Sequence, residues 1–341
     1  MDRFALLPAS ERLPYFETKA GELSVRPGLI EKDFWVCWTL KQLFSLEKIG
    51  EHITFKGGTS LSKCYNAIYR FSEDVDIAIE RKYLESGKNI EPAFDQSNNE
   101  NDRRIKELLV ASKNTIHNEI LPQLRKRVGE VLGNDGQWTI ELDAGDALQQ
   151  TLLFSFPAVT KKQEIGYIKP VVKIELGARA DDRPAQVIEV RPYVADILPN
   201  ALAIDPVSVR VLAAPRTFWE KVMILHRLYH SPEDKAVAQR MSRHYYDVYQ
   251  IGQTEILEKA LAEDGLLQSV VNFNRLFYKY SWLNYDEAKR GSLRLIPKNA
   301  DRLKALKADY RQMEEMFFNA YPTFDEIVTG LQRIEDRINQ I

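Results

Sequence analysis

Two aspartates, Asp74 and Asp76, are the residues whose type and spacing point most directly to chemistry. They belong to the run DVDIAIE, whose alternation of charged and apolar residues predicts a β-strand with one wet face. Side chains two positions apart on a strand share a face, so the two carboxylates are expected to converge on one cation. Magnesium prefers oxygen ligands and is usually held between carboxylates and substrate phosphates. Taken alone, however, a D-x-D pattern is common on the solvated face of edge strands.

The residues upstream strengthen the magnesium interpretation. The run HITFKGG predicts a short strand that ends at Gly57 and Gly58, and a helical pattern follows over residues 59–69. Two glycines let the backbone approach a ligand closely, and the first turn of a helix offers N–H groups to a phosphate. Thr59 and Ser60 add hydroxyl donors. Phosphate cradle, helix and acidic strand thus follow in the order that a triphosphate–Mg²⁺ site would use, while the GxxxxGK[ST] pattern of a P-loop is missing from the sequence.

The other elements predict a mixed half followed by a helical half. Helical spacing is expected over residues 29–48 and over much of 83–136, with loops at 89–103 and 133–136. The β-rich runs cover residues 138–144, 151–159, 168–176 and 187–194. From Pro215 the pattern is helical to the end. The prediction is an α/β (α+β) domain with a mixed sheet over residues 1–205, a linker near 198–216, and a helical domain over 206–341.

The composition is that of an ordinary globular protein, with 44% hydrophobic and 28% charged residues. The net charge of −2 excludes nucleic-acid binding through overall charge, so such binding would need a local basic patch. Cys37 and Cys64 form no CxxC or Cys/His cluster, which argues against a zinc site or a disulfide framework. No apolar run reaches the roughly 18 residues of a membrane helix, and the first residues lack a signal-peptide core. We therefore expect a cytoplasmic protein.

Together these motifs resemble a known family. Strand, Gly-Gly, helix and D-x-D are similar to the minimal nucleotidyltransferase signature of the DNA polymerase β superfamily. More closely, KGGTSLSK and RFSEDVDI resemble the AbiEii/AbiGii toxins, a family that includes the toxins of type IV abortive-infection systems and the MenT tRNA-modifying toxins. Three other segments resemble family features: Glu31–Trp35, Trp219–Lys221 and His244–Asp247. The similarity extends over about residues 28–300.

The resemblance implies a polymerase-β-like nucleotidyltransferase domain and a magnesium-dependent enzyme. Such an enzyme would transfer a nucleoside monophosphate from an NTP to an acceptor hydroxyl. The acceptor would be the 3′ end of tRNA, and the outcome would be growth arrest in a toxin–antitoxin system of phage defence. The implied partners are an NTP, tRNA and a cognate antitoxin encoded nearby, with no membrane. Mg²⁺ would be held by Asp74 and Asp76. The residues expected to bind the triphosphate are Gly57, Gly58, Thr59 and Ser60.

The superfamily fold uses a third carboxylate from a neighbouring strand, and the run VVKIEL offers a matching position. It places Lys173 and Glu175 on one strand face. By resemblance, Glu175 would complete the metal site and Lys173 would bind a phosphate. An ordinary cross-strand ion pair is the alternative.

Two residues of the helical half complete the expected site. By resemblance, Lys221 would bind the triphosphate as a point charge and Asp247 would be the acid of the last family motif. Asp247 could either orient Lys221 or act as general base for the acceptor hydroxyl, and the sequence does not separate these roles. A solvated helix lysine and a surface aspartate are the alternatives. The two residues can meet if helices at 215–231 and 238–252 pack antiparallel.

Other basic residues are candidates for phosphate contact. Arg70 and Arg243 can match a phosphate with two hydrogen bonds, although Arg70 could instead neutralise the nearby aspartates. A predicted C-terminal helix carries a basic series, either a track for RNA phosphates or an ordinary solvated face. The series consists of Lys298, Arg302, Lys304, Lys307 and Arg311.

His226 and His230 have the spacing of a zinc-binding pair on a helix. The HExxH glutamate and a third ligand are missing from the sequence, so we expect ordinary histidines.

The predicted site is a cleft between the two domains. Two other functions remain compatible with it. One is nucleotidylation of a protein hydroxyl at the same centre, and the other is a non-catalytic nucleotide-binding interaction protein. The presence of Asp74, Asp76, Lys221 and Asp247 argues against the second, since a protein without activity has no chemical need for all four.

Overall fold

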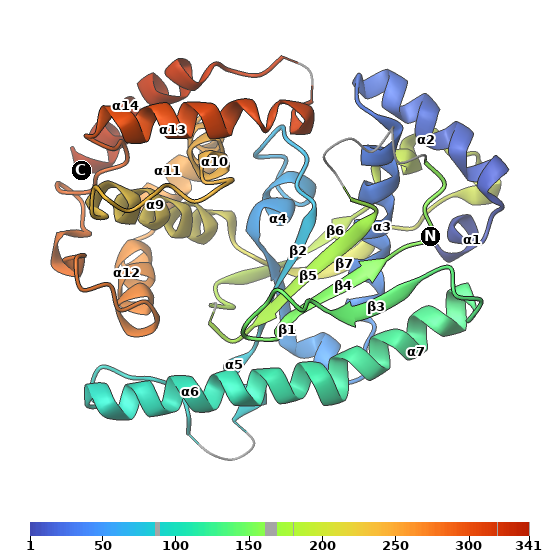
Figure 1. The fold of residues 1–341 in the computed structure, drawn as a ribbon, viewed down its shortest axis with the longest axis horizontal. Helices are drawn as coiled ribbons and strands as arrows, with labels where there is room; N and C mark the ends of the chain where they lie inside the picture. The colour runs from blue at the N-terminus through green and yellow to red at the C-terminus, as the bar shows by residue number, and fades with distance from the viewer. Residues whose placement is uncertain (86–88, 161–168, 180, 319, 341) are drawn as a thin grey trace. The chain divides into compact units, whose positions relative to one another are not determined.

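The computed structural model describes residues 1–85, 89–160, 169–179, 181–318 and 320–340 (Figure 1). The chain divides into two compact units. Unit 1 comprises Met1–Cys64 and Phe71–Leu212, and unit 2 comprises Tyr65–Arg70 and Ala213–Ile341. The chain therefore leaves unit 1 for residues 65–70 and then returns to it. This division falls after Leu212, whereas the sequence placed the domain boundary after residue 205.

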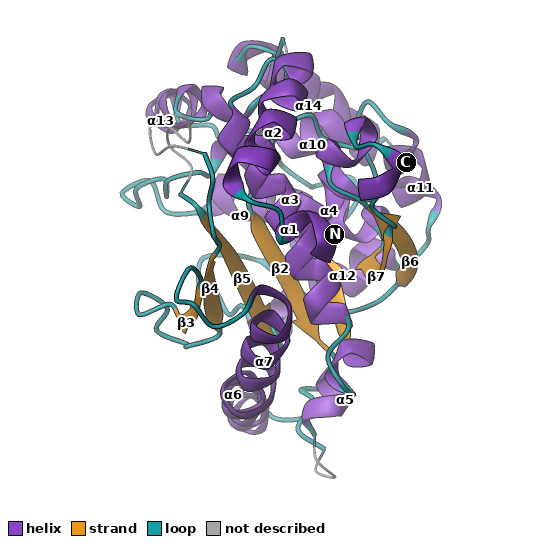
Figure 2. Cartoon of the chain, turned by 90° about the vertical axis from the view of Figure 1, so that its right-hand side faces the viewer, coloured by secondary structure: helices purple, strands orange, loops and turns teal. Residues whose placement is uncertain are grey.

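Within the described residues, unit 1 is built on a mixed sheet of seven strands in the order β3-β4-β5-β2-β1-β7-β6, seen from the side in Figure 2. The pairs β2–β5 and β1–β7 are parallel, and the other neighbouring pairs are antiparallel. The mixed α/β sheet predicted from the sequence is thus confirmed. The strands are β1 (Ile53–Lys56), β2 (Asp74–Ile79), β3 (Thr139–Leu142), β4 (Thr151–Ser155), β5 (Val171–Gly177), β6 (Ala185–Val190) and β7 (Val207–Leu212).

The predicted strands are present and each is shorter than predicted, although β5 ends one residue later and β6 begins two residues earlier, but β7 was not predicted. Its residues were assigned to a linker because prolines and alanines surround them. The run VSVRVL nevertheless alternates with period two, and Val209 and Val211 are fully buried. β7 pairs with β1 at Phe55 and Val211, so it lies beside the strand that leads into the Gly-Gly turn. Ile168, the first residue of the run predicted at 168–176, lies outside the described residues.

The helix predicted at 29–48 is α3 (Pro27–Phe44). Proline at its first position fits a helix start, where the missing N–H is not needed. Fifteen of its eighteen residues are buried, so α3 is a central element covered on several sides. It packs against β2, β5 and β7 and against α2 (Ala9–Leu23), which follows the short α1 (Asp2–Ala5).

The helix expected at residues 59–69 is shorter and begins earlier, as α4 (Gly57–Lys63). It ends because residues 65–70 join unit 2. There the Tyr69 carbonyl accepts a hydrogen bond from the Phe318 N–H at 3.2 Å, and Arg70 forms a β-bridge with Phe317.

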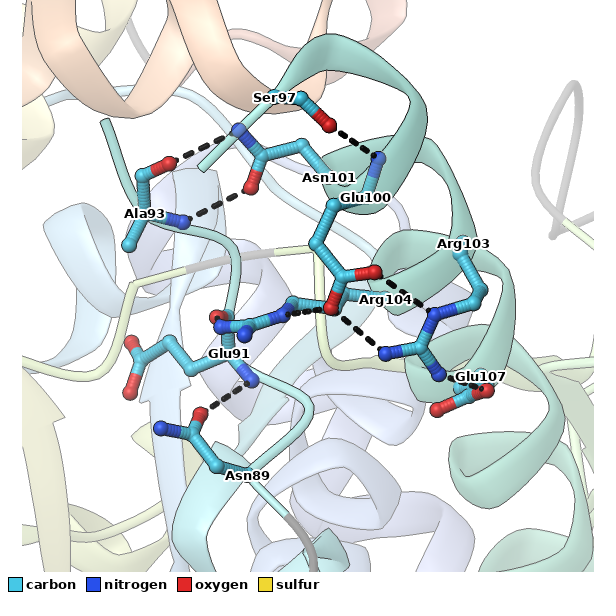
Figure 3. Close-up of polar contacts among 9 residues, drawn as sticks. All are labelled: Asn89, Glu91, Ala93, Ser97, Glu100, Asn101, Arg103, Arg104 and Glu107. Carbon is cyan, nitrogen blue, oxygen red and sulfur yellow. Dashed lines mark hydrogen bonds and ion pairs between the residues drawn. The ribbon is translucent and has the colours of Figure 1, made fainter. Parts of the chain in front are cut away.

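A long helical segment runs end to end through α6 (Asn98–Thr115), the π-helix η2 (Ile116–Ile120) and α7 (Leu121–Leu132), as Figure 1 shows. The loop predicted at 89–103 ends earlier, because the Ser97 side chain accepts the Glu100 N–H and caps α6. Asn101 also binds both backbone groups of Ala93, which ties the preceding loop to the helix (Figure 3). The short α5 (Arg81–Leu84) comes before this loop, and residues 86–88 lie outside the described residues.

Unit 2 is helical, as predicted for the C-terminal half. α9 packs against α10, α11 and α12, and α10 packs against α13 and α14. Its helices are α9 (Ala214–His230), α10 (Ser242–Ile251), α11 (Glu255–Ala262), α12 (Leu266–Phe277), α13 (Ala300–Arg311) and α14 (Phe324–Asn339). The short 3₁₀ helices of the two units are η1 (Ile49–His52), η3 (Tyr193–Ile197), η4 (Asn200–Leu202), η5 (Tyr285–Glu287) and η6 (Glu314–Met316). Among the helices described, none is both long enough and apolar enough to cross a bilayer.

Candidate active site

The turn from β1 into α4 brings backbone and carboxylate into close approach. Gly57 has a φ of +77°, in the left-handed region that favours glycine. A β-carbon at this position would lie 1.8 Å from Oδ2 of Asp76 and 2.6 Å from its Cγ. Asp76 is also the register partner of Lys56, the residue before Gly57. Glycine is therefore required here twice, for the backbone angle and for the room that the Asp76 carboxylate takes.

The two hydroxyls of the turn are used inside unit 1. The Thr59 hydroxyl donates to the backbone carbonyl of Asp74 at 2.5 Å, and the Ser60 hydroxyl donates to the carbonyl of Gly57 at 2.9 Å. Both residues are buried. Thr59 thus links α4 to the first residue of β2, and the donors that this turn can offer an anion are its backbone N–H groups.

The four polar residues expected on one face of the sheet do lie there. Along β2, Asp74 and Asp76 are half-buried while Val75 between them is buried. Along β5, Lys173 and Glu175 are half-buried while Ile174 between them is buried. The parallel register pairs Asp74 with Lys173 and Asp76 with Glu175.

Lys173 and Glu175 form an ion pair within their strand rather than across strands. Burial acts to lower the pKa of Lys173, but the Glu175 and Asp74 carboxylates outweigh it and the net shift is upward. Lys173 therefore stays positively charged beside the two aspartates.

The donor set on this face suits a hard cation such as magnesium, which binds carboxylate oxygens. The close contact of the Asp76 carboxylate with the Gly57 backbone leaves space for no side chain between them. Within the described part of the chain, no three His, Cys, Asp or Glu side chains are gathered closely enough to hold a metal ion together. The participation of Glu175 in a metal site accordingly stays a prediction.

Unit 2 contains the other expected residues in one buried cluster. Asp247 on α10 is fully buried and binds Arg70 through both carboxylate oxygens, at 2.8 Å each. Its Oδ2 also lies 2.8 Å from Nζ of Lys221 on α9. Lys221 and Asp247 thus meet, as the helical-hairpin prediction required, and neither is a solvated surface residue. Arg70 pairs with Asp247, a residue that lies 177 positions away in the chain.

The charged groups of this cluster shift one another's pKa values. Burial alone would raise the pKa of Asp247, but Arg70 and Lys221 hold it well below its usual range, so Asp247 is a carboxylate. Burial, together with the positive charges of Arg70 and Arg243, lowers the pKa of Lys221, although Asp247 acts in the opposite direction. One buried carboxylate thus binds both a guanidinium and an ammonium.

His244, in the same segment as Asp247, received no role from the sequence. It is surrounded by this cluster, and burial followed by the charges of Lys221 and Arg243 lowers the pKa of its imidazole well below the ordinary value. His244 is therefore neutral near pH 7 and adds no charge to the cluster.

The zinc alternative for His226 and His230 finds no support. Nδ1 of His226 accepts a hydrogen bond from the Arg294 N–H at 3.1 Å. In the neutral ring the proton is then on Nε2, which leaves no lone pair there for a metal.

The C-terminal basic series does not form a continuous basic track. Arg302 is buried and donates to the carbonyls of Leu228, Ser231, Pro232 and Lys235, where it closes the end of α9. Lys307 pairs with Asp325 on α14. Both residues of the series therefore have partners within unit 2.

Sequence reasoning gave no role to a set of buried charged residues around α4 and β2. Lys32 pairs with Glu73, and Asp33 pairs with Lys63. A signal was present, because charged residues at positions 31–33 interrupt an otherwise apolar helix. From the sequence alone, that segment indicated only the family resemblance.

The family model of the nucleotidyl transferase AbiEii toxin, type IV toxin–antitoxin system, matches residues 38–330. No curated protein matches the chain significantly.

Two solved structures are similar over nearly the whole chain. One is MenT4, nucleotidyltransferase toxin Rv2826c from Mycobacterium tuberculosis H37Rv, with 14% identity and a TM-score of 0.42, covering 98% of this chain and 97% of that chain. The other is JHP933 from Helicobacter pylori, with 12% identity and a TM-score of 0.40, covering 91% of this chain and 90% of that chain. At these values no function is transferred from either structure. The family model matches most of the length of this chain, and the chain therefore belongs to the AbiEii nucleotidyltransferase toxins of type IV toxin–antitoxin systems.

Proposed function

We propose that this toxin transfers a nucleoside monophosphate from an NTP to the 3′-terminal hydroxyl of tRNA and thereby arrests growth. The acceptor oxygen would bond to the α-phosphorus, the bond from that phosphorus to the bridging β-oxygen would break, and pyrophosphate and the hydroxyl proton would leave. The observation that carries the proposal is the paired carboxylates of Asp74 and Asp76 on one half-buried strand face, with Asp76 held against the backbone of Gly57.

Unit 1 would supply the metal and phosphate ligands. Asp74 and Asp76 would hold Mg²⁺, with Glu175 as the third carboxylate by resemblance. When bound, magnesium neutralises the triphosphate and makes pyrophosphate a better leaving group. Gly57 and Gly58 would receive phosphate oxygens on their backbone N–H groups. Thr59 and Ser60 would support this turn from inside, because their hydroxyls already donate to Asp74 and Gly57.

Lys173 would remain next to the acidic pair as a phosphate ligand. Its ion pair with Glu175 keeps the ammonium charged and places it in register with Asp74. An ion pair of two half-exposed side chains contributes little stability, so releasing Lys173 toward a phosphate would cost little.

Unit 2 would supply positive charge, and its geometry favours one of the two roles considered for Asp247. A general base needs an accessible oxygen and a pKa near the working pH. Asp247 is fully buried, both oxygens are bound by cations, and its pKa lies well below the usual range. We therefore propose that Asp247 orients Lys221, that Lys221 carries charge to the triphosphate, and that Arg70 fixes Asp247.

Arg70, which binds Asp247 in unit 2, is also close in sequence to the acidic pair of unit 1, since only three residues separate it from Asp74. In this proposal the arginine acts by holding Asp247. Direct contact of Arg70 with a phosphate remains the prediction made from the sequence.

The family also implies a partner, a cognate antitoxin, and a nucleoside triphosphate as substrate. The tRNA acceptor is supported by the resemblance alone. A protein hydroxyl is the rival acceptor, since the same centre would serve it.

The acceptor can be identified by label transfer. Purified toxin would be incubated with Mg²⁺ and each of the four α-³²P-labelled NTPs, together with total tRNA or total cell protein. We expect label in tRNA, and we expect periodate oxidation of the tRNA 3′ diol to prevent it. Label in protein would favour the rival acceptor. Label in neither, with equal inertness of wild type and Asp74→Ala, would contradict the proposed transfer.

A further inference from the structure

Three consecutive charged residues of α3 are buried: Glu31, Lys32 and Asp33 have 0%, 3% and 2% exposure. Successive helix residues point about 100° apart, so the three together cover more than half of the helix circumference and cannot share one wet face. Charges inside a protein are unfavourable unless they are paired and hydrogen-bonded. The partners of these three residues therefore indicate what their burial serves.

Glu31 holds a segment outside the candidate active site. Its carboxylate accepts the backbone N–H groups of Val159 and Thr160 at 2.7 and 2.9 Å, and the Thr160 hydroxyl at 2.5 Å. Its acceptors are thus satisfied by a loop that follows β4.

Lys32 and Asp33, in contrast, both bind the elements of the candidate site. The Lys32 ammonium lies 2.7 Å from Oε2 of Glu73, the residue immediately before Asp74. Strand alternation places Glu73 on the same side as buried Val75, which is the side covered by α3, while Asp74 and Asp76 point to the other side.

Asp33 binds the last residue of α4. Its Oδ1 lies 2.8 Å from Nζ of Lys63, and its Oδ2 accepts the Tyr193 N–H at 2.7 Å. The Lys63 ammonium also lies over the Tyr193 ring, 3.6 Å from its centroid. α4, which begins at Gly57, is thus fixed at its far end by α3 and η3.

These two pairs stand at the points where the chain leaves unit 1 and returns to it. Lys63 is the second-last residue before the excursion of Tyr65–Arg70, and Glu73 is the third residue after it. During the excursion the chain carries Arg70, which binds Asp247 in unit 2. Without anchors on both sides, any movement of that segment would be passed to Asp74 and Gly57 through a few peptide units.

We propose that Lys32 and Asp33 are positioning residues, which anchor the exit and return of the chain so that the Gly57 turn and the Asp74/Asp76 pair keep their places. The inference rests on the proposed nucleotidyl transfer for its catalytic consequence. In this proposal each buried ion pair fixes one geometry, whereas apolar side chains of similar volume tolerate repacking.

The test compares Lys32→Met with Lys19→Met. Lys19 serves as the control because it is also a buried lysine of unit 1, on α2, whose ion pairs are with Glu22 and with Asp196 of η3 and not with a residue of α4 or β2. Amide hydrogen exchange would be followed by mass spectrometry in the full-length chain. We expect Lys32→Met to speed exchange at residues 57–63 and 73–79 by about tenfold or more, with β3 and β4 unchanged, and Lys19→Met to leave all four segments as in wild type.

The same variants would be assayed for transfer. Lys32→Met should lower kcat by about 10²-fold and raise the Mg²⁺ concentration needed for half-maximal rate, while Lys32→Arg should keep most activity. If Lys32→Met fails to fold, Glu73→Gln, which keeps the shape of its side chain, takes its place.

The outcomes separate the two proposals. Unchanged exchange at 73–79 in Lys32→Met, or an equal effect of Lys19→Met, would overturn the positioning role even if wild type transfers nucleotide. Locally faster exchange together with an inert wild type would leave the anchoring intact and remove the proposed reaction.

Discussion

Replacing Gly57 by alanine tests the closest approach in the candidate site. The φ of +77° at Gly57 lies in the left-handed region, where a β-carbon costs about 1–2 kcal/mol. The new carbon would also lie 1.8 Å from Oδ2 of Asp76, and real β-carbons essentially never approach such an atom within 3.0 Å. The carboxylate must therefore move by about 1 Å or more, a displacement that is enough to cost about 10²-fold in rate.

The two costs can be measured separately. Gly136 is a matched control because its φ is +82° and nothing lies within 4 Å of a β-carbon built there. We expect Gly57→Ala and Gly136→Ala each to lose about 1–2 kcal/mol of unfolding free energy in urea titrations. Only Gly57→Ala should also lose about 10²-fold in kcat for label transfer, which corresponds to about 2.7 kcal/mol of transition-state stabilisation.

Equal kcat in the two alanine variants would refute this reasoning. It would mean that the Asp76 carboxylate can leave its place over Gly57 without consequence, and therefore that its position there is not part of the catalytic geometry. A stability loss in Gly57→Ala without any loss of activity would lead to the same conclusion.

Three further predictions concern unit 2. Asp247→Asn should destabilise the protein by about 3–5 kcal/mol because it removes the carboxylate that pairs with the buried Arg70 and Lys221. The control Asp325→Asn breaks an exposed pair with Lys307 and should cost at most about 1 kcal/mol. Comparable Tm shifts for the two variants would contradict a stabilising role of the buried Asp247 pairs. Burial and His230 lower the pKa of His226 to about 4, so between about pH 6.5 and 4 the unfolded chain binds a proton that the folded chain does not. The free energy of unfolding should fall as the pH is lowered through this window, by about 2 kcal/mol at pH 5. If the unfolding free energy of a His226→Gln variant, from urea titrations, fell with pH as steeply as that of wild type, His226 would not be the cause. Burial lowers the pKa of Lys221 below its ordinary value of 10.5, so kcat should decline on the alkaline side before an ordinary lysine titrates. Arginine stays charged, so an active Lys221→Arg variant should shift that decline to higher pH. An identical alkaline limb in both proteins would exclude Lys221 as its cause.

The parts of the site that follow from local pattern could be predicted. The alternation of DVDIAIE gave the strand and the shared face of Asp74 and Asp76, and two glycines after an apolar run gave the turn. The second strand of polar residues, with Lys173 and Glu175, was also recognisable from period-two alternation. In each case a few neighbouring residues contain the whole signal.

The parts that depend on long-range pairing could not be predicted. Nothing near Arg70 reveals that its partner is Asp247, because the pair forms through tertiary packing. The helix predicted to continue to residue 69 ends at Lys63 for the same reason, since residues 65–70 pack in unit 2. β7 was missed for another reason: prolines and alanines surround it, although VSVRVL itself alternates with period two, and it is an inner strand between β1 and β6.

The most direct test of the account is the dependence of nucleotidyl transfer on the Asp74/Asp76 pair. With the acceptor and NTP identified by the label-transfer survey, pyrophosphate release and label incorporation would be measured together in wild type, Asp74→Asn and Asp76→Asn, with and without Mg²⁺. We predict equal amounts of pyrophosphate and incorporated label in wild type and a strict need for Mg²⁺. In each variant we predict that the transfer rate falls by about 10²–10³-fold or more. Undiminished transfer by either folded variant would contradict it.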